Sequence, residues 1–306
     1  MEKIYDVAII GAGPAGLSAS IYARRKNLSV IIISNEIGGE VAESGDIENY
    51  LGFKSIKGEE LVRKFEEHAR KFSPDITFDY IKEIKKDNEN FKIVGEKEYI
   101  AKTVIVATGR IHRRLEIPGE KEFVGHGVSY CVTCDAPFFQ DKIVAVVGGG
   151  NTAVTSAILL SAIAKKVYII HRRDKFRADE IEVDRMKKIE NIELIMNSNV
   201  VEIKGDKVVK SIMIKNVKTN EIKELPIEGI FINIGEIANS TFLDKMVKIN
   251  DRGEIIVDEI CRTNNPGIFA AGDVTNIRDK QIITSAAQGA IAALSAYEYL
   301  YKNKRI

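Results

Sequence analysis

The sequence predicts an α/β protein in which one dinucleotide-binding plan is used twice. A G-x-G-x-x-G loop, residues 11–16, follows a short apolar run near the start of the chain. A second glycine loop, residues 148–153, follows another apolar run and fits G-x-G-x-x-A. Between the two loops lies a C-x-x-C pair, Cys131 and Cys134. At 306 residues the chain is long for one compact domain and comfortable for two.

The composition excludes several classes of protein. The 45 basic residues nearly balance the 44 acidic ones, so the chain lacks the basic surplus of a nucleic-acid-binding surface. Three cysteines are too few for a secreted protein held together by disulfides, and they favour a reducing compartment. No apolar run is long enough to span a membrane. We therefore expect a soluble cytoplasmic enzyme.

The C-x-x-C pair has two possible interpretations, a redox-active disulfide and part of a zinc site. Two cysteines separated by two residues can close a small, strained disulfide that opens and re-forms easily. The alternative is half of a zinc site, which needs a second such pair or two well-placed histidines. The chain has only one further cysteine, and its four histidines show no metal-ligand spacing. Redox chemistry is favoured, no metal site is predicted, and a dithiol between two dinucleotide loops suggests relayed electron transfer.

The first glycine loop is expected to join a buried strand, residues 7–10, to a helix that runs through about Lys26. In such a loop the first glycine permits a tight turn. The second lets a pyrophosphate approach the backbone, and the third lets helix and strand pack closely. A second strand, 30–33, is expected next. The acid that commonly binds a ribose after this strand is missing, and Asn35 or Glu36 stands in its place.

Periodicity predicts the remaining elements of the first half. Apolar residues recur at helical spacing over 58–72, where the outer face is charged. Residues 76–84, 91–94 and 98–102 are typical of a small β-meander, which we expect to be the only antiparallel part of this half. Residues 104–109 are expected to form another buried strand that ends in a glycine turn.

The second half repeats this plan. The second glycine loop is expected to lead into a helix, residues 151–165, and then a strand, 167–170. Residues 208–214, 222–225 and 229–234 then repeat the meander and the final strand of the first half, with Gly235 at the turn. The chain is therefore predicted to hold two copies of one supersecondary plan.

The residues after strand 167–170 indicate which nucleotide the second loop binds. His171, Arg172 and Arg173 follow the strand directly, and Arg177 lies just beyond. An NAD site needs an acid here, whereas arginines accommodate the 2′-phosphate of NADP. A solvated run of charge is the alternative. The position after the second strand of a dinucleotide unit favours NADPH.

The C-terminal tail is expected to complete the first domain. Residues 266–274 are predicted to form an apolar strand that ends in Gly272 and Asp273, and residues 281–301 a long helix with small residues on one face. A carboxylate at a strand end can bind a ribitol hydroxyl, and a helix N-terminus favours a phosphate or an electron-rich flavin edge. The alternative is a plain core strand and helix. Cys261 is expected to be a buried structural thiol.

Together these motifs resemble the low-molecular-weight thioredoxin reductases, flavoproteins of the two-domain pyridine nucleotide–disulfide family. The resemblance covers nearly the whole chain, and the dithiol just ahead of the second loop is its most discriminating feature. It implies an FAD-binding domain split between residues 1–114 and 241–306, with an NADPH-binding domain that carries the dithiol inserted at 115–240. It also implies a homodimer. The resemblance is carried by residues 11–16, 107–109, 131–135, 148–153, 171–173 with 177, and 270–274.

The resemblance also implies the site residues. The catalytic residues would be Cys131, Cys134 and Asp135. FAD would be bound by Gly11, Gly13, Pro14, Ala15, Gly16, Asn35, Gly39, Glu40, Asn49, Thr108, Gly109, Gly272, Asp273, Gln281 and Ile282. NADPH would be bound by Gly148, Gly150, Asn151, Thr152, Ala153, His171, Arg172, Arg173, Arg177 and Gly235.

Three departures from the family pattern bear on these assignments. The family often has glutamine where Glu40 stands, so the flavin of this chain is expected to have a more acidic environment. The segment 235–240 lacks the proline that usually precedes its asparagine. Ser34 and Asn35 leave open which residue binds the adenosine ribose of FAD.

The mechanism implied by the resemblance passes electrons from NADPH to FAD, then to the dithiol, and then to a thioredoxin- or glutaredoxin-like protein. Cys134 would face the flavin, Cys131 would attack the partner's disulfide, and Asp135 would donate and accept the proton. The dithiol and the nicotinamide site belong to the same inserted domain, so both are expected to reach the flavin only through a swivel about residues 111–115 and 235–242.

Three alternatives remain open at the level of sequence. A flavin-dependent dithiol oxidase would use the same C-x-x-C with oxygen as acceptor. A thioredoxin reductase could take its electrons from deazaflavin or ferredoxin, although such relatives usually lose the arginine motif. A non-catalytic redox sensor would leave Asp135 and the paired loops without a role.

Overall fold

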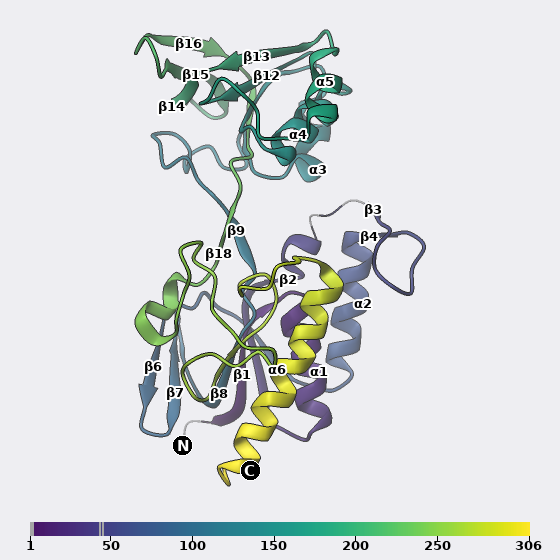
Figure 1. Ribbon diagram of the computed structural model, residues 1–306, viewed down its shortest axis with the longest axis vertical. Coiled ribbons are helices and arrows are strands. Elements are labelled where there is room, and N and C mark those ends of the chain that lie inside the picture. Colours follow the sequence, from purple (N-terminus) through teal and green to yellow (C-terminus); the bar gives the residue numbers. More distant parts are fainter. Residues whose placement is uncertain (1–2, 43, 45) are drawn as a thin grey trace. The chain divides into compact units, whose positions relative to one another are not determined.

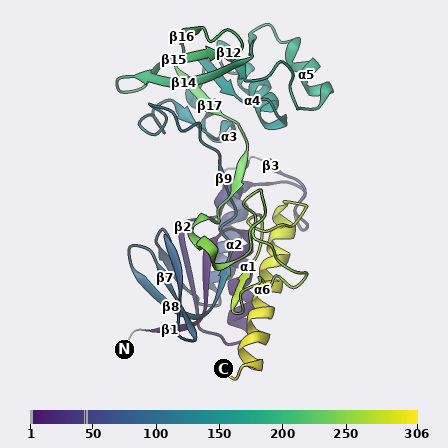
Figure 2. The same cartoon turned by 60° about the vertical axis from the view of Figure 1, so that its left-hand side comes forward.

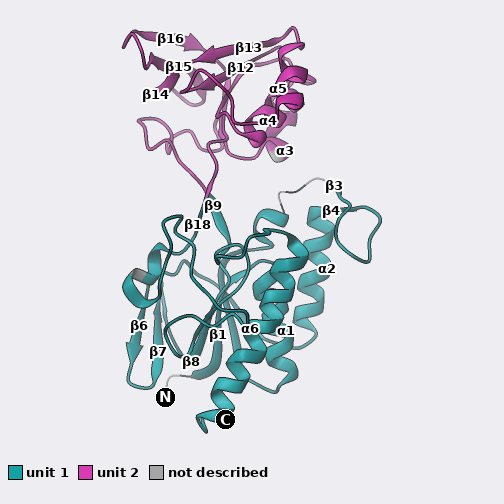
Figure 3. Cartoon of the chain, viewed as in Figure 1, with its two compact units in different colours: residues 1–111, 237–306 teal, residues 112–236 magenta. Residues whose placement is uncertain are grey.

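The computed structural model describes residues 3–42, 44 and 46–306. The chain divides into two compact units, of which the first comprises residues 1–111 and 237–306 and the second residues 112–236 (Figure 3). The chain therefore leaves the first unit once and returns to it once. The two connecting segments, β9 (Arg110–His112) and β18 (Glu236–Ala238), pair with each other.

The first unit is built on a seven-stranded sheet (Figures 1 and 2). Its strands are β1 (Ile4–Ala12), β2 (Val30–Ile37), β5 (Asp75–Phe78), β6 (Glu83–Asp87), β7 (Asn90–Val94), β8 (Glu98–Val106) and β19 (Ile268–Ala270). The strand order is β5-β2-β1-β8-β7-β6, and β19 also pairs with β8. Strands β1, β2, β5, β8 and β19 are parallel, whereas β6 and β7 form an antiparallel edge.

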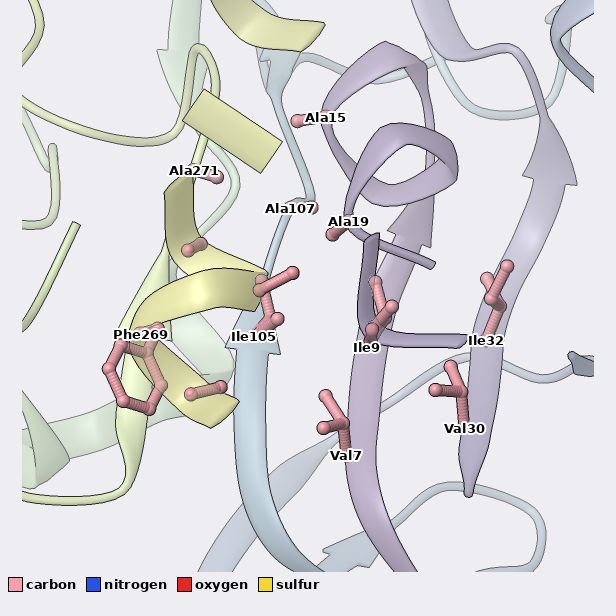
Figure 4. Packing of buried hydrophobic residues seen from close by; sticks show 14 of the residues in the cluster. Val7, Ile9, Ala15, Ala19, Val30, Ile32, Ile105, Ala107, Phe269 and Ala271 are labelled. Atoms are coloured by element: carbon pink, nitrogen blue, oxygen red, sulfur yellow. The ribbon is translucent and has the colours of Figure 1, made fainter. Parts of the chain in front are cut away.

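Both faces of this sheet are buried, because its central strands are unbroken apolar runs. Ile9 pairs with Ile32 of β2 and with Ile105 of β8, and all three are fully buried. Their side chains belong to the core that also contains residues of helices α1 (Pro14–Arg25) and α6 (Ile282–Lys302) (Figure 4). The alternate residues of the strands point into a second core, which includes Phe91 and Ile255.

Helices α1 and α6 pack closely because the residues between them are small. A Cβ added to Gly289 of α6 would lie 2.0 Å from the carbonyl oxygen of Ala15 in α1. The C-terminal helix, from the far end of the chain, thus packs directly against the start of the first helix. This contact explains why the small-residue face predicted in the tail is needed.

The structure corrects two predictions for the first unit. Residues 76–84 are not one strand of a meander. Strand β5 ends at Phe78 and pairs with β2, and the meander begins separately at Glu83. Asp79 causes the break, because its carboxylate accepts the backbone N–H groups of Glu96 and Lys97 at 2.8 and 3.1 Å. The meander is also not the only antiparallel part, since β3 (Asp46–Ile47) pairs antiparallel with β4 (Ile56–Lys57).

The first unit also contains helix α2 (Gly58–Arg70) and short 3₁₀ helices. Helix α2 begins at the residue after β4, and its apolar stripe packs on the segment that precedes β3. The predicted helix 58–72 is therefore present, although it ends two residues earlier. These elements are η1 (Gly39–Val41), α2 (Gly58–Arg70) and η3 (Thr241–Met246).

The second unit has its own parallel sheet of five strands, in the order β10-β17-β11-β12-β13. These strands are β10 (Val128–Ser129), β11 (Ile143–Val147), β12 (Lys166–His171), β13 (Ile192–Met196) and β17 (Gly229–Ile232). A separate antiparallel sheet contains β14 (Ser198–Gly205), β15 (Val209–Asn216) and β16 (Ile222–Pro226). The helical elements are α3 (Val132–Asp135), η2 (Ala136–Phe139), α4 (Asn151–Ser161) and α5 (Glu180–Lys187).

The predicted fold class is confirmed, because each unit contains a parallel sheet with a glycine loop between a strand and a helix. The helix after the second loop is shorter than predicted and ends at Ser161 rather than 165. Elements β13, β14 and α5 were not predicted. Among the residues that the structure describes, no helix has the length and apolar character that crossing a membrane requires.

Candidate active site

The glycines of the first loop differ in how closely other atoms of the protein approach them. A Cβ on Gly11, whose φ is +105°, would lie 2.2 Å from the carbonyl oxygen of Ala107. A Cβ on Gly16 would lie 1.9 Å from the carbonyl oxygen of Gly11. These two glycines are required by the protein's own packing. A Cβ on Gly13, in contrast, would have its nearest neighbour 3.8 Å away, so the backbone there is open to an approaching group.

Helix α1 starts at this open position. Gly13 is its N-cap and offers no side chain to the first N–H groups, while Pro14 occupies the first turn. Helix α1 also has no acidic residue in its first turn. Unsatisfied N–H groups and the helix dipole together favour an anion such as a pyrophosphate.

The C-terminal tail brings further predicted FAD residues into this unit. The carboxylate of Asp273 accepts a hydrogen bond from the Ser285 hydroxyl at 2.7 Å. Gln281 caps helix α6 through a capping box with Thr284, and its Oε1 accepts a hydrogen bond from Nδ2 of Asn49 at 3.1 Å. Two predicted contacts that are 232 residues apart in sequence, Asn49 and Gln281, are thus bonded to each other.

Strand β2 runs past its predicted end at residue 33 to Ile37, so Ser34 and the two candidate ribose contacts after it lie within the strand. The Ser34 hydroxyl is buried, accepts the backbone N–H of Ala12 at 3.2 Å and donates to the carbonyl of Glu36 at 2.7 Å. Ser34 therefore holds the first loop against the second strand. Asn35 and Glu36 are exposed, so either side chain remains available to a ribose.

The remaining predicted FAD residues lie in the same unit. Thr108 donates its hydroxyl to the carbonyl of Asn239 at 2.6 Å. Gly109 has a φ of +62°, and a Cβ there would meet nothing within 4 Å. Gly39 and Glu40 belong to η1, where Glu40 is exposed and has interactions of its own.

The second unit contains a pocket of about 490 Å³, within the size range of small-molecule sites. Residues 148–150 of the second glycine loop line it, and a Cβ on Gly150 would meet nothing within 4 Å. A Cβ on Gly148 would lie 2.2 Å from the carbonyl oxygen of Asn233, so this glycine is required for packing. Ala153 replaces the third glycine and is fully buried. The pocket is lined by residues 113–115, 147–150, 152, 170–172, 177, 198–201 and 233–235.

Positive charge in the pocket comes from two segments. Arg172 and Arg177 line it after strand β12, and Arg113 and Arg114 line it from the segment that enters the unit. Among the residues that the structure describes, neither Arg172 nor Arg177 forms a side-chain ion pair, so both guanidinium groups are available to an anion. Arg173 was predicted with them but does not line the pocket.

His171 supports the loop rather than facing the pocket freely. Its ring is 5 % exposed, stacks on Phe176 with centroids 5.4 Å apart, and donates from Nε2 to the carbonyl of Lys175 at 3.0 Å. A Cβ on Gly149 would lie 2.2 Å from the ring. Burial and the charges of the three nearby arginines lower the pKa of His171, although the bond to Lys175 opposes that shift.

Asn151 and Thr152 open helix α4 at the edge of the pocket. Thr152 lines the pocket, whereas the side chain of Asn151 is bonded to Asp179 by Nδ2 to the carboxylate at 3.1 Å. The side-chain oxygen of Asn151 also accepts the backbone N–H of Asp179 at 2.8 Å. Asn151 therefore ties the loop before α5 to the start of α4.

The redox segment lies in the same unit as the pocket. Cys131 is half-buried and disulfide-bonded, and its backbone N–H donates to the Ser129 hydroxyl at 3.1 Å. The backbone of residues 132–135 forms α3, and the Asp135 N–H donates to the Cys131 carbonyl at 3.2 Å. The side chain of Cys134 lies outside the described residues. Cys261, in the other unit, is a free and buried thiol whose pKa burial raises to about 12.

Sequence reasoning missed several polar residues of this pocket, among them two arginines and an asparagine. Arg113 and Arg114 stand in a segment with no motif, and Asn233 lies in what reads as an apolar strand. The signal that identifies Asn233 is structural: it is 8 % exposed, and its side-chain oxygen has no hydrogen-bond partner among the described residues.

The chain thus combines two units, each with a glycine loop between a parallel strand and a helix, and the second unit also carries a disulfide-bonded cysteine, Cys131. A family model described as pyridine nucleotide-disulphide oxidoreductase matches residues 5–293. The chain belongs to this family, which unites proteins of pyridine nucleotide and disulfide chemistry.

Individual relatives show which members of this family the chain is similar to. Thioredoxin reductase from Bacillus subtilis (strain 168) is 43 % identical over 303 residues, which is 98 % of this chain and 96 % of that protein. The crystal structure of Lactococcus lactis thioredoxin reductase in its FR conformation superposes with a TM-score of 0.83 at 41 % identity, covering 97 % of this chain and 99 % of that one. A ferredoxin-flavin thioredoxin reductase from Clostridium acetobutylicum superposes with a TM-score of 0.56 at 34 % identity, covering 99 % of this chain and 100 % of that one. The resemblance to thioredoxin reductases stated from the motifs is confirmed.

Proposed function

We propose that this chain is an NADPH-dependent flavoprotein that reduces the disulfide of a thioredoxin-like protein. One observation supports this most: the second unit carries both a disulfide-bonded Cys131 and a pocket whose glycine loop is followed by Arg172 and Arg177. A guanidinium pair matches a phosphate dianion better than a ribose hydroxyl. The full-length similarity to thioredoxin reductases agrees with it.

FAD is assigned to the first unit because the residues there suit it. The open backbone at Gly13 and the uncapped start of α1 suit a pyrophosphate, and the Asp273 carboxylate suits a hydroxyl of the ribityl chain. When bound, FAD supplies a two-electron carrier between the nicotinamide and the disulfide. Helix α6 would close the site, with Gln281 and Ile282 at its first turn.

The dithiol residues have separate roles in the proposal. Cys134 exchanges electrons with the cofactor, and the Cys131 thiolate attacks the partner's disulfide, forming a mixed disulfide that Cys134 then resolves. Each thiolate forms only if its proton has an acceptor, and Asp135, next in sequence to Cys134, provides the acceptor. The proposal also includes a cytoplasmic homodimer.

A swivel between the units is part of the proposal. Cys131 and the nucleotide pocket both belong to residues 112–236, whereas FAD is assigned to the other unit. One flavin then serves two sites in turn, which requires motion at the paired connections β9 and β18. A verified disulfide cross-link between cysteines introduced into the two units should stop turnover and preserve one half-reaction. Full steady-state activity in the cross-linked protein would count against the swivel.

The experiment that tests the proposed function is reduction of thioredoxin by the purified protein. We expect a yellow protein that contains FAD and oxidises NADPH, but not NADH, when oxidised thioredoxin is added. Oxygen uptake driven by a dithiol without NADPH would favour a dithiol oxidase instead. Reduction of thioredoxin with ferredoxin or a deazaflavin, but not with NADPH, would favour a different donor. A colourless protein that takes up no FAD would refute all three.

A further inference from the structure

Asn233 is a buried polar residue to which the proposed function gives no role. It follows strand β17 and lines the nucleotide pocket. Its side-chain nitrogen, Nδ2, donates to the backbone carbonyl of Tyr130 at 3.4 Å. A carbonyl only accepts, so this contact fixes which end of the amide is which. The side-chain oxygen, Oδ1, is the atom left without a partner among the described residues.

The unpartnered oxygen is rigidly held. The backbone N–H of Asn233 donates to the carbonyl of Val147 at 2.8 Å, and its carbonyl is in contact with the tight turn at Gly148. Tyr130, whose backbone carbonyl accepts the Asn233 amide N–H, donates its hydroxyl to the Glu120 carboxylate at 2.8 Å. Glu120 is 1 % exposed, and its carboxylate also accepts two backbone N–H groups of the segment that lines the pocket. The oxygen itself is enclosed in this structure, so a donor reaches it only when the surrounding side chains shift slightly.

The topology indicates which part of a nucleotide would meet Asn233. Strand β11, which leads into the phosphate loop, has β12 on one side and β17 on the other. Arg172 and Arg177 follow β12, so a 2′-phosphate bound there places the adenosine half on that side. The pyrophosphate lies over the loop. The remaining half must then extend toward the end of β17, where Asn233 stands.

We propose that Oδ1 of Asn233 accepts a hydrogen bond from the nicotinamide half of the bound nucleotide. This inference rests on the proposed use of NADPH. The pyrophosphate has only acceptors, so it cannot satisfy the oxygen. The nicotinamide half has two kinds of donor, the N–H groups of its carboxamide and the hydroxyls of its ribose. Asn233 is thus a binding residue that fixes the nicotinamide end, while the arginines fix the other end.

The test compares two ligands on the oxidised FAD-containing protein by calorimetry. NADP⁺ carries both halves, whereas adenosine 2′,5′-bisphosphate carries only the half that the arginines would bind. Asn233→Ala should weaken NADP⁺ binding about tenfold, the effect of one lost hydrogen bond, and leave the bisphosphate unchanged. Arg172→Gln should weaken both ligands. Should Asn233→Ala fail to fold, Asn233→Ser gives the same comparison, since it also removes the amide oxygen.

Two results would overturn the inference. One is unchanged NADP⁺ affinity in Asn233→Ala. The other is an equal loss for both ligands, which would indicate a structural role only. If the protein does not use NADPH, the unaltered protein would bind neither ligand. This result separates failure of the proposed function from failure of the inference about Asn233.

A nucleotide analogue identifies the donor. In the 3-acetylpyridine analogue of NADP⁺ a methyl group replaces the carboxamide nitrogen and its N–H groups. If the carboxamide is the donor, the unaltered protein should bind the analogue about tenfold more weakly than NADP⁺, and Asn233→Ala should bind the two equally. If a ribose hydroxyl is the donor, Asn233→Ala should weaken the binding of NADP⁺ and of the analogue by the same factor. Both results support the proposal and separate its two sources.

Discussion

The two glycine loops follow one backbone plan and differ in what surrounds it. In each, a Cβ on the first glycine would lie 2.2 Å from a carbonyl oxygen, and the second glycine faces open space. Within the second strand of the first unit, however, Ser34 is bonded inward, whereas Arg172 and Arg177 follow the second strand of the other unit and have no ion pairs among the described residues. In the proposed function the shared backbone would bind a pyrophosphate, and the side chains beside it would select between the two dinucleotides.

The units also differ in their thiols. Cys261 of the first unit is 2 % exposed, and its raised pKa keeps it protonated at neutral pH. Cys131 of the second unit is half-buried and disulfide-bonded. Thiolates are the reactive species, so only the second unit has a cysteine that is suited to exchange.

The largest expected effect comes from replacing the cysteines of the C-x-x-C pair, which distinguish the second unit from the first. Cys131→Ser and Cys134→Ser should each abolish reduction of thioredoxin, because neither leaves a dithiol to exchange. Reduction of the flavin by NADPH should survive in both and is measured by stopped-flow absorbance without oxygen. Only Cys131→Ser, which keeps a Cys134 thiolate, should show a long-wavelength charge-transfer band.

Cys261→Ala is the control for these variants. It removes a cysteine that lies outside the site, so turnover should remain near that of the unaltered protein. Normal thioredoxin reduction by either C-x-x-C variant would show that the dithiol is not a relay.

Adding one methyl group to each loop tests the assignment of the two nucleotides. Gly150→Ala fits the backbone, whose φ is −96°, but its Cβ enters the open space above the loop. We expect the KM for NADPH to rise about a hundredfold, as for two or more lost hydrogen bonds to a phosphate, with normal flavin content. Gly13→Ala should do the opposite, losing flavin while the second unit still binds NADP⁺.

Gly148→Ala is the steric contrast within the same loop. Its Cβ would lie 2.2 Å from the Asn233 carbonyl oxygen, and its φ of +154° is unfavourable for alanine. This variant should lower the melting temperature, whereas Gly150→Ala should not. Loss of flavin from Gly150→Ala would mean that the two loops have been assigned to the wrong nucleotides.

The comparison of the loops also shows what sequence can predict. Part of the first loop is determined locally, since a Cβ on Gly16 would lie too close to the carbonyl oxygen of Gly11 in the same loop. The break at Asp79 was not predicted, because it depends on backbone groups of residues 96 and 97, which lie in the turn between β7 and β8. Asn233 was missed for the same reason. Its unpartnered oxygen has meaning only beside a pocket built from distant segments.

A smaller effect is expected from removing the charges that distinguish the loops. Arg172→Gln combined with Arg177→Gln should reduce the preference for NADPH over NADH about a hundredfold, as expected for two charge-assisted hydrogen bonds. The ratio of kcat/KM for the two nucleotides measures it, and flavin content should not change. Arg173→Gln, whose residue does not line the pocket, should have a smaller effect. Equal use of both nucleotides by the unaltered protein would contradict the assignment.

The smallest expected effect is on the pH dependence of stability. Burial and nearby arginines lower the pKa of His171 below its ordinary value of 6.5, so the unfolded chain takes up this proton more readily than the folded one. The stabilising contribution of the neutral ring is complete above pH 6.5 and is lost as the pH falls through the folded pKa. The free energy of unfolding by urea should therefore be lower at pH 5 than at pH 7.5, and His171→Phe should reduce that difference.

The histidine matched to His171 is His126, an exposed residue of the same unit. His126→Phe is the matched control, because it removes a histidine of the same unit and leaves the ring beside the arginines in place. The bound nucleotide adds a second prediction with the opposite sign. A 2′-phosphate at Arg172 and Arg177 would neutralise part of the positive charge that disfavours protonation of His171. NADP⁺ should then raise the pKa of His171, which a proton uptake on binding near pH 6 would reveal in buffers of different ionisation enthalpy. An identical pH dependence in the His171 and His126 variants would show that the ring beside the arginines is not the group that titrates.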